Sequence, residues 1–215
     1  MKKLLVLPFC LLTHAAVAAT SLNLSVTGTI EPPSCDIALA GTGQVDYGNI
    51  VLNPTGITGA SLQSQRKDQA LSISCLSPAY TGLRLVDNRT SSVPGTANAT
   101  KYGLGFDSAN NPIGYFNIAI KDVLVDGGVG QLKVTADPTA GTWAAVSSTA
   151  LIETYALASK TYAFDSATTP TTVPKAMTTM TGTITVGEQI QPRNTLDTTT
   201  EIVLDGSATF ELIYL

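Results

Sequence analysis

Few side chains in this sequence are suited to catalysis or metal binding. Histidine occurs once, as His14, and the three cysteines are Cys10, Cys35 and Cys75. His14 and Cys10 both lie within the first 18 residues, so their part in the chemistry depends on whether that segment is retained.

The leading segment predicts export. Lys2 and Lys3 form a positive start, Leu4 to Leu12 form an apolar core, and Ala16-Val17-Ala18 offers small residues for a signal peptidase. These are the three parts of a secretory signal peptide. The apolar run is much shorter than the roughly 20 residues that span a bilayer, so we interpret residues 1–18 as a signal and not an anchor. Cleavage after Ala18 or Ala19 fits equally well, and no membrane span is predicted afterwards.

Cleavage removes most of the catalytic repertoire. Without histidine, Ser–His and Cys–His nucleophiles and histidine-bound zinc are impossible, so we predict no cofactor and no metal. Paired carboxylates remain possible, and we interpret the candidates as turns and solvated faces: Asp107, Asp122, Asp126 and Glu153. Residues 127–130 are glycine-rich but lack the following Lys-Ser/Thr of a phosphate loop. The chain is therefore predicted not to be an enzyme.

Cys35 and Cys75 are the cysteines that remain, and in an exported chain two cysteines usually pair. A disulfide between them would close a loop of about 40 residues and contribute roughly 4 kcal/mol in the chain-entropy treatment. Two free buried thiols are the alternative.

Composition and charge restrict the classes of binding partner that we expect. Charged residues are 13% of the chain. Loss of Lys2 and Lys3 leaves ten basic against sixteen acidic residues, with no basic run. This balance argues against nucleic acid or anionic lipid as a partner. The length suits one domain, and the weakly charged composition favours packing against copies of the same chain.

Most segments of the sequence are predicted to be β-strands, and these strands must position the residues named above. Short or alternating apolar runs recur between Gly, Pro, Asn and Asp breakers such as Asp126-Gly127-Gly128, which indicates an all-β sandwich or barrel. The predicted strands are 22–30, 44–50, 70–76, 82–86, 115–120, 129–135, 181–187, 202–204 and 207–215. Ala144 to Lys160 is the one stretch where some helix is possible, and Thr168 to Thr183 is expected to be a loop or edge segment.

The N-terminal strand pattern is the most informative. Apolar residues and a glycine occupy alternate positions, and Asn, Ser and Thr stand between them: Leu22, Leu24, Val26, Gly28 and Ile30. Because side chains alternate along a strand, one face is apolar and the other polar. Pro32 and Pro33 then stop any ladder, so we expect this segment to lie outside the disulfide-closed domain. An ordinary first strand of the same domain is the alternative.

The C-terminal pattern is its counterpart. Ala208, Phe210, Leu212 and Tyr214 alternate with Thr209, Glu211, Ile213 and Leu215, which predicts a core strand. Ile202 and Leu204 share the same phase.

Together these elements resemble the subunits of chaperone–usher fimbriae. Such subunits have an alternating extension with a glycine on its apolar face, a first cysteine soon after, a second about 40 residues later, and a last strand with a penultimate tyrosine. Residues 45–50 also resemble the stretch between their cysteines. The ending from Leu196 is similar to a fimbrial-like branch of unknown function. The resemblance is thin over about 91–181. The glycine that these subunits often carry 14 residues from the end is Ile202 here, and the nearest glycine is Gly206.

The resemblance implies an immunoglobulin-like (pilin) β-sandwich lacking its final strand, with residues 19–33 as an N-terminal donor-strand extension and 34–215 as the domain. The extension would complete the sandwich of a neighbouring subunit, and the C-terminal strand would border the vacant groove. The implied partners are other fimbrial subunits, a periplasmic chaperone and an outer-membrane usher. The expected location is the cell surface, reached through the periplasm.

A carbohydrate-binding module, as in fimbrial tip adhesins, is a second functional hypothesis. Trp143 with nearby Tyr155 is the pair whose rings could stack on a sugar. The donor-like N-terminal strand and the lack of room for two full domains favour the structural subunit.

Overall fold

The structure is a computed structural model that describes residues 22–31, 34–52, 62–63, 66–96, 99–146, 154–155, 158, 160–166 and 173–215. It divides into two units, Met1–Pro32 and Pro33–Leu215, which are described separately. The predicted signal peptide lies outside the described residues. In the first unit, residues 22–31 have no regular secondary structure, and the four apolar side chains Leu22, Leu24, Val26 and Ile30 are 88–100% exposed.

The described part of the second unit is all-β and contains three short 3-10 turns and no α-helix. Its strands are β1 (Cys35–Leu39), β2 (Leu62–Gln63), β3 (Lys67–Ala79), β4 (Thr81–Asp87), β5 (Tyr102–Gly103), β6 (Gly114–Val125), β7 (Gly128–Thr135), β8 (Ala144–Ala145), β9 (Thr154–Tyr155), β10 (Thr161–Ser166), β11 (Met177–Ile190) and β12 (Ala208–Tyr214). The 3-10 turns are η1 (Thr90–Ser92), η2 (Pro138–Ala140) and η3 (Arg193–Thr195).

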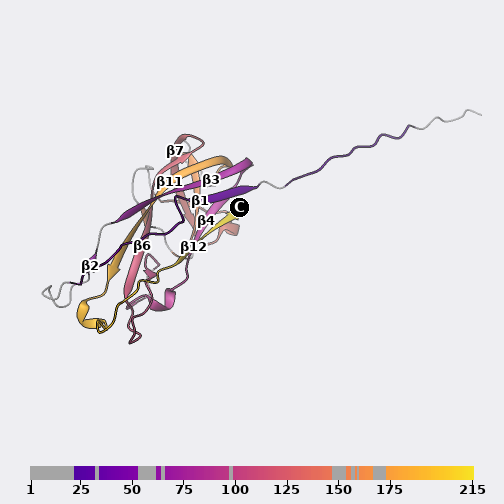
Figure 1. The fold of residues 1–215 in the computed structure, drawn as a ribbon. Coiled ribbons are helices and arrows are strands. Elements are labelled where there is room, and N and C mark those ends of the chain that lie inside the picture. Colours follow the sequence, from indigo (N-terminus) through magenta and orange to yellow (C-terminus); the bar gives the residue numbers. More distant parts are fainter. Residues whose placement is uncertain are drawn as a thin grey trace, which may run out of the picture. The chain divides into compact units, whose positions relative to one another are not determined.

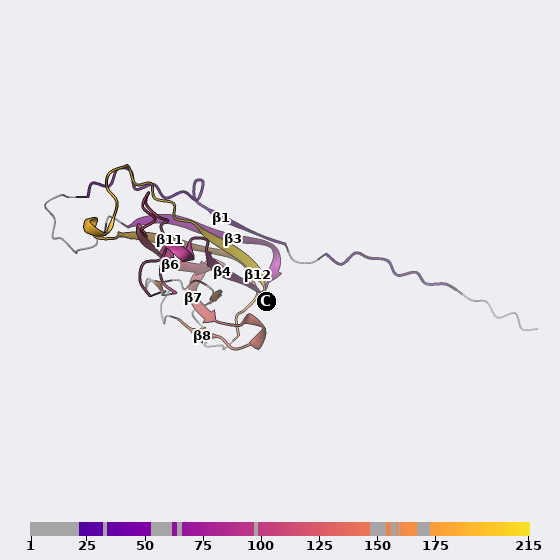
Figure 2. The same ribbon diagram turned by 90° about the horizontal axis from the view of Figure 1, so that it is seen from below.

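The strands form one antiparallel path in the order β1-β3-β11-β6-β7-β10-β4-β12, with β2, β5, β8 and β9 pairing beside it. The path curls around a single core and is nearly closed (Figures 1 and 2). Its two ends are β1 and β12, and among the described strands neither pairs along its outer edge.

The core explains why these segments form strands. Apolar side chains recur at alternate positions, so each strand buries one face. The largest fully buried side chains come from both halves of the path: Leu71 and Ile73 of β3, Leu83 and Leu85 of β4, Ile118 and Ile120 of β6, Tyr162 and Phe164 of β10, and Met177 and Met180 of β11. These side chains form one cluster. Partly buried side chains of β1 and β12 pack against it, so both end strands share the same core.

Two local features set the topology. Asp126 and Gly127 join β6 to β7 with φ angles of 48° and 77°, which is the left-handed geometry that two-residue hairpin loops favour. Tyr80 alone separates β3 from β4. Because β3 pairs with β1 and β11 while β4 pairs with β10 and β12, the chain changes from one half of the path to the other at this residue.

Most of the predicted strands are confirmed. Residues 70–76, 82–86, 115–120, 129–135 and 181–187 lie in β3, β4, β6, β7 and β11, and β12 matches the predicted 207–215. The sequence reading missed β1 and β10 and the short strands β2, β5, β8 and β9. The described parts of 144–160 include two of these short strands and no helix.

Four predictions of secondary structure are wrong. Residues 22–30 form no strand, since no described segment pairs with them. Residues 44–50 turn at Gly48, whose φ is 62° and whose N–H donates to the Asp46 carboxylate at 2.7 Å. Residues 202–204 keep alternating burial but form no ladder. Residues 177–180, part of the stretch 168–183 expected to be a loop or edge segment, lie in β11 between β3 and β6.

No helix within the described residues has the length and apolar character to cross a membrane.

Candidate functional site: a groove between the first and last strands

The outer edge of β1 carries backbone groups that no described strand pairs with. The Ser34 carbonyl accepts from Leu76 N–H at 2.9 Å, and Ala40 N–H donates to the Ala70 carbonyl at 2.8 Å. Backbone groups of successive residues alternate direction in an antiparallel pair. The even residues of this segment therefore bond to β3, and Cys35, Ile37 and Leu39 direct theirs away from it.

The same residues carry the inward side chains of β1. Cys35, Ile37 and Leu39 are half-buried and pack against the core, while Asp36 and Ala38 are exposed. This edge therefore offers apolar side chains and outward backbone groups on the same three residues, and of these groups Cys35 N–H bonds to the Tyr214 hydroxyl.

On the outer edge of β12 it is the even-numbered residues that direct their backbone groups outward. Asn88 N–H donates to the Ser207 carbonyl at 3.0 Å, and Leu215 N–H donates to the Tyr80 carbonyl at 3.0 Å. Odd residues therefore bond to β4, and even residues direct their backbone groups outward. Of these, Ala208, Phe210 and Leu212 are half-buried against the core.

A groove, defined here as the gap between β1 with residues 42–52 and β12 with residues 196–207, lies between these two edges. Two cavities of about 420 and 570 Å³ follow one another along it and share Val45, Tyr47 and Leu204. The floor of the smaller cavity is made of core side chains of β6 and β11: Phe116, Ile118, Ile184 and Val186. The groove thus opens onto the hydrophobic core.

One end of the groove, here called the disulfide pole, is marked by Cys35, Cys75 and Tyr214. Cys35 and Cys75 are directly opposite in the β1–β3 ladder and form a disulfide, which confirms the predicted pairing. Tyr214 reaches across the groove, and its hydroxyl accepts a hydrogen bond from Cys35 N–H at 2.8 Å. The penultimate tyrosine therefore closes this end by joining β12 to β1.

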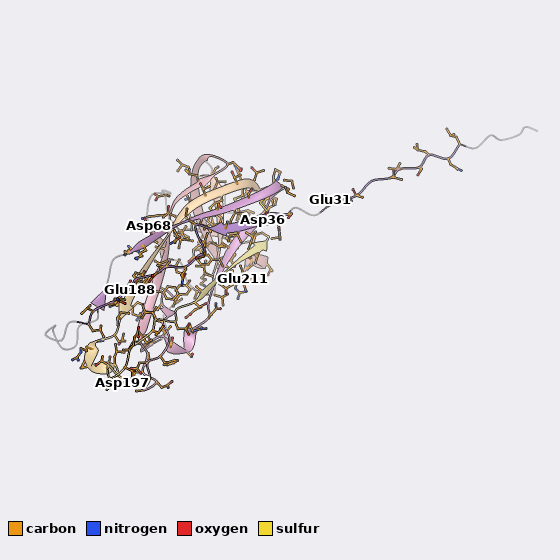
Figure 3. The ribbon with its side chains drawn as sticks, in the orientation of Figure 1. Glu31, Asp36, Asp68, Glu188, Asp197 and Glu211 are labelled. Carbon is orange, nitrogen blue, oxygen red and sulfur yellow. A yellow bond between two sulfur atoms is a disulfide. The ribbon has the colours of Figure 1, made fainter. Side chains whose placement is uncertain are left out.

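The other end, here called the η3 pole, comprises residues 45–52 and 193–204. Asp36 near the first pole and Asp197 near the second lie at opposite ends of the domain (Figure 3). The larger cavity lies here, and its lining includes apolar Ile50, Leu52 and Ile202 together with Arg193.

Tyr47 holds the wall of the groove against β11. Its hydroxyl donates to the Val186 carbonyl at 2.8 Å. Burial raises the pKa of the Tyr47 phenol, and the neighbouring Glu188 carboxylate raises it further, so the hydroxyl remains a donor over the physiological range. Glu188 is fully buried in β11 (Figure 3). This contact anchors residues 45–50 in place of a strand ladder.

Gly206 lets the opposite wall approach the core. A Cβ atom at this position would lie 2.9 Å from the Phe116 ring and 3.0 Å from Leu104. Any larger residue would push the wall away from the groove floor.

The structure brings together the residues predicted to border the groove but not those predicted to form the donor strand. Ala208, Phe210, Leu212 and Tyr214 lie together along the groove, whereas the donor candidates Leu22, Leu24, Val26, Gly28 and Ile30 belong to the other unit.

The carboxylate candidates do not form a pair. Asp126 accepts from Thr178 N–H at 2.9 Å, at the start of β11, and Asp107 accepts from Asp197 N–H at 2.7 Å, beyond its end. From Thr178 to Ile190 the strand β11 extends roughly 40 Å, so the two sites belong to opposite ends of this strand. Asp122 is exposed on β6, and Glu153 lies outside the described residues.

The sugar-stacking candidate is also not available. Trp143 is 8% exposed, so little of its ring can meet a ligand. The side chain of Tyr155 lies outside the described residues.

Several groove residues were missed from the sequence. Ile37 and Leu39 carry an alternating signal that begins at Cys35, but Asp36 and Ala38 have low strand propensity and obscured it. The contributions of Tyr47 and Gly206 depend on contacts with β11 and β6, and no local pattern announces them.

The chain belongs to a family described as "Protein of unknown function (DUF1120)", whose profile matches residues 24–137. This match includes most of the N-terminal alternation and both cysteines. A curated relative, Protein GltF of Escherichia coli (strain K12), is 27% identical over 234 aligned residues, covering 93% of this chain and 91% of that protein.

Proposed function

We propose that this chain is a structural subunit of a surface fimbria, exported through the periplasm and polymerised by donor-strand exchange. In this proposal the domain is an immunoglobulin-like pilin sandwich that lacks its final strand. The observation that carries the proposal is the groove between β1 and β12, whose edges carry half-buried apolar side chains and outward backbone groups on the same residues.

The N-terminal segment has the phase that the groove requires. Residues directly opposite in an antiparallel pair share a face of the sheet. If even residues of segment 22–30 stand opposite even residues of β12, then Leu24, Val26 and Ile30 point into the core. Their polar neighbours point to solvent. The same pairing satisfies the outward N–H and C=O groups of β12.

The orientation of the donor follows from the two edges. β1 runs away from the disulfide pole and β12 runs toward it, as their pairing with β3 and β4 shows. A strand between them is parallel to one and antiparallel to the other. We favour the arrangement antiparallel to β12, because parallel pairing is slightly less stable and β12, with seven residues, offers a longer edge than the five residues of β1.

In this orientation the N-terminal segment can fill the groove of another subunit but not the groove of its own domain. It places Ile30 toward the η3 pole of the acceptor, whereas five residues after Ile30 the donor chain enters β1 at its own disulfide pole. Five residues span about 18 Å at most, which is less than the roughly 23 Å covered by the seven residues of β12. A chain cannot fill its own groove in this direction, so a second copy must supply the strand.

The remaining partners follow from the exposed groove. Unpaired strand edges and exposed core residues promote aggregation, so we propose that a periplasmic chaperone occupies the groove until an outer-membrane usher brings in the next subunit. No catalytic role is proposed.

The test uses two variants of the full exported chain. A chain without residues 22–30 keeps the groove but has no donor, and Phe210→Glu keeps the donor but places a charge in the groove. We expect neither to form fibres alone in electron micrographs. Together they should form a two-chain complex that resists SDS without heating. Thr209→Glu, on the solvent face of β12, is the matched control and should polymerise. Fibres from the chain without residues 22–30 would overturn the proposal.

A further inference from the structure

We propose that the disulfide pole of one subunit packs against the η3 pole of the next subunit, forming an interface in addition to the inserted strand. This inference rests on the proposed function, because the inserted strand is what brings two copies together. The observation behind it is that exposed apolar side chains gather at the disulfide pole and at the η3 pole of the domain.

The disulfide pole presents an apolar surface around Cys35. Leu76 is 90% exposed, and its N–H bonds to the Ser34 carbonyl, the residue immediately before β1. Tyr214 is half exposed and bonds to Cys35 N–H through its hydroxyl. Tyr80, also half exposed, accepts from Leu215 N–H. Leu76 and Tyr214 therefore lie beside the start of β1, and Tyr80 lies opposite Leu215, the residue after Tyr214.

The η3 pole presents a smaller apolar surface on both walls of the groove. Val51 is 78% exposed and Val203 is 70% exposed. Val203 lines the larger cavity, and so do Ile50 and Leu52 on either side of Val51. These valines flank the mouth through which a donor strand antiparallel to β12 would leave the groove.

The connecting segment is too short to hold the two poles apart. From Ile30 to Cys35 the chain advances five residues, which span about 18 Å when fully extended. Once Ile30 is seated, Cys35 and the side chains around it lie beside the η3 pole of the acceptor.

The resulting contact joins two different surfaces of the same chain. A contact of this kind repeats from copy to copy and produces an open filament. Because the inserted strand tethers the two surfaces, even a weak apolar contact forms at a high effective concentration. The interface would therefore fix the angle between successive subunits without having to hold them together.

Cysteine cross-linking of the full exported chain tests this contact. Leu76→Cys combined with Val203→Cys is treated with a short bismaleimide in assembled fibres and then heated in SDS to remove donor strands. We expect a ladder of covalent multimers. Ala38→Cys with Val203→Cys is the matched control, because Ala38 is exposed on the outer face of β1, and it should give monomer. Tyr80→Cys with Val51→Cys is a second pair for the same contact.

The outcomes separate the two proposals. Absence of fibres from the unmutated chain refutes donor-strand polymerisation itself. Fibres in which neither test pair cross-links, or in which the Ala38→Cys pair cross-links equally, refute the interface and leave the polymer intact. A ladder from either test pair, with monomer from the control, supports the contact.

Discussion

Replacing Val26 with aspartate gives the sharpest test of the donor strand. In the first unit this side chain is 88% exposed, so its free energy of burial is still to be gained when the segment enters a groove. Full burial of a valine contributes about 1.5–3 kcal/mol. Val26→Asp forfeits this contribution and also requires a carboxylate to lose water, which costs several kcal/mol for a charge without a partner.

The combined loss is at least about 4 kcal/mol, which corresponds to roughly a thousandfold weaker association at about 1.4 kcal/mol per factor of ten. Thr27→Asp is the matched control, because it adds the same charge one residue away on the polar face. Thr27 would point to solvent in the docked strand, so we expect an effect below about 1 kcal/mol, typical of surface substitutions.

The assay compares the two variants as full exported chains. Fibres are counted by electron microscopy, and the ladder of multimers is measured on SDS gels run without heating. We expect the Val26→Asp chain to lose both and the Thr27→Asp chain to keep both. Equal assembly of the two variants would falsify the assigned phase of the strand, and equal loss would show that any charge in the segment is harmful.

Three further predictions concern the domain itself. Replacing Cys35 and Cys75 together by alanine should lower the free energy of unfolding by about 4 kcal/mol, since the closed loop spans 40 residues; an unchanged urea midpoint would contradict this. Lys133→Ala should cost about 3–5 kcal/mol because it removes the buried positive charge whose Nζ lies 3.5 Å from the buried Asp165 carboxylate; a thermal melt equal to that of the unmutated domain would refute it. Burial raises the pKa of Asp126, but hydrogen bonds from the Thr178 and Thr179 side chains and N–H groups outweigh it, and the net pKa is lowered. A lowered folded-state pKa stabilises above the unfolded value of about 3.9 and is lost as pH falls through the folded value. The unmutated domain should therefore lose more stability between neutral and strongly acidic pH than Asp126→Asn, and equal losses would contradict the assignment.

The sequence was informative wherever one strand's own side chains carry the pattern. β12 was predicted within one residue at each end because Ala208, Phe210, Leu212 and Tyr214 alternate without interruption. The breaker Asp126-Gly127-Gly128 was placed correctly between two strands, and its residue types match the backbone geometry of the turn found there. The disulfide followed from cysteine count and the expected compartment.

The sequence failed where structure depends on a partner. Residues 44–50 have the composition of a strand, but Gly48 turns the chain and the Tyr47 hydroxyl bonds to β11 instead of a ladder. The alternation of Ile202 and Leu204 correctly indicated burial against the core, yet burial alone does not supply a neighbouring strand. Periodicity predicts which face is buried, and a ladder additionally needs an edge with which to bond.

That distinction bears directly on the N-terminal segment. Its alternation is as regular as that of β12, but β12 has β4 beside it and forms seven paired positions, whereas residues 22–30 have no described partner and form none. A strand pattern without a neighbour and a sheet with two unpaired edges are complementary deficits. In both the odd-numbered β1 edge and the even-numbered β12 edge, the residues that face the core also direct their backbone groups into the groove. One added strand with an apolar face can therefore satisfy side chains and backbone together, and the segment with that face precedes β1 by only a few residues.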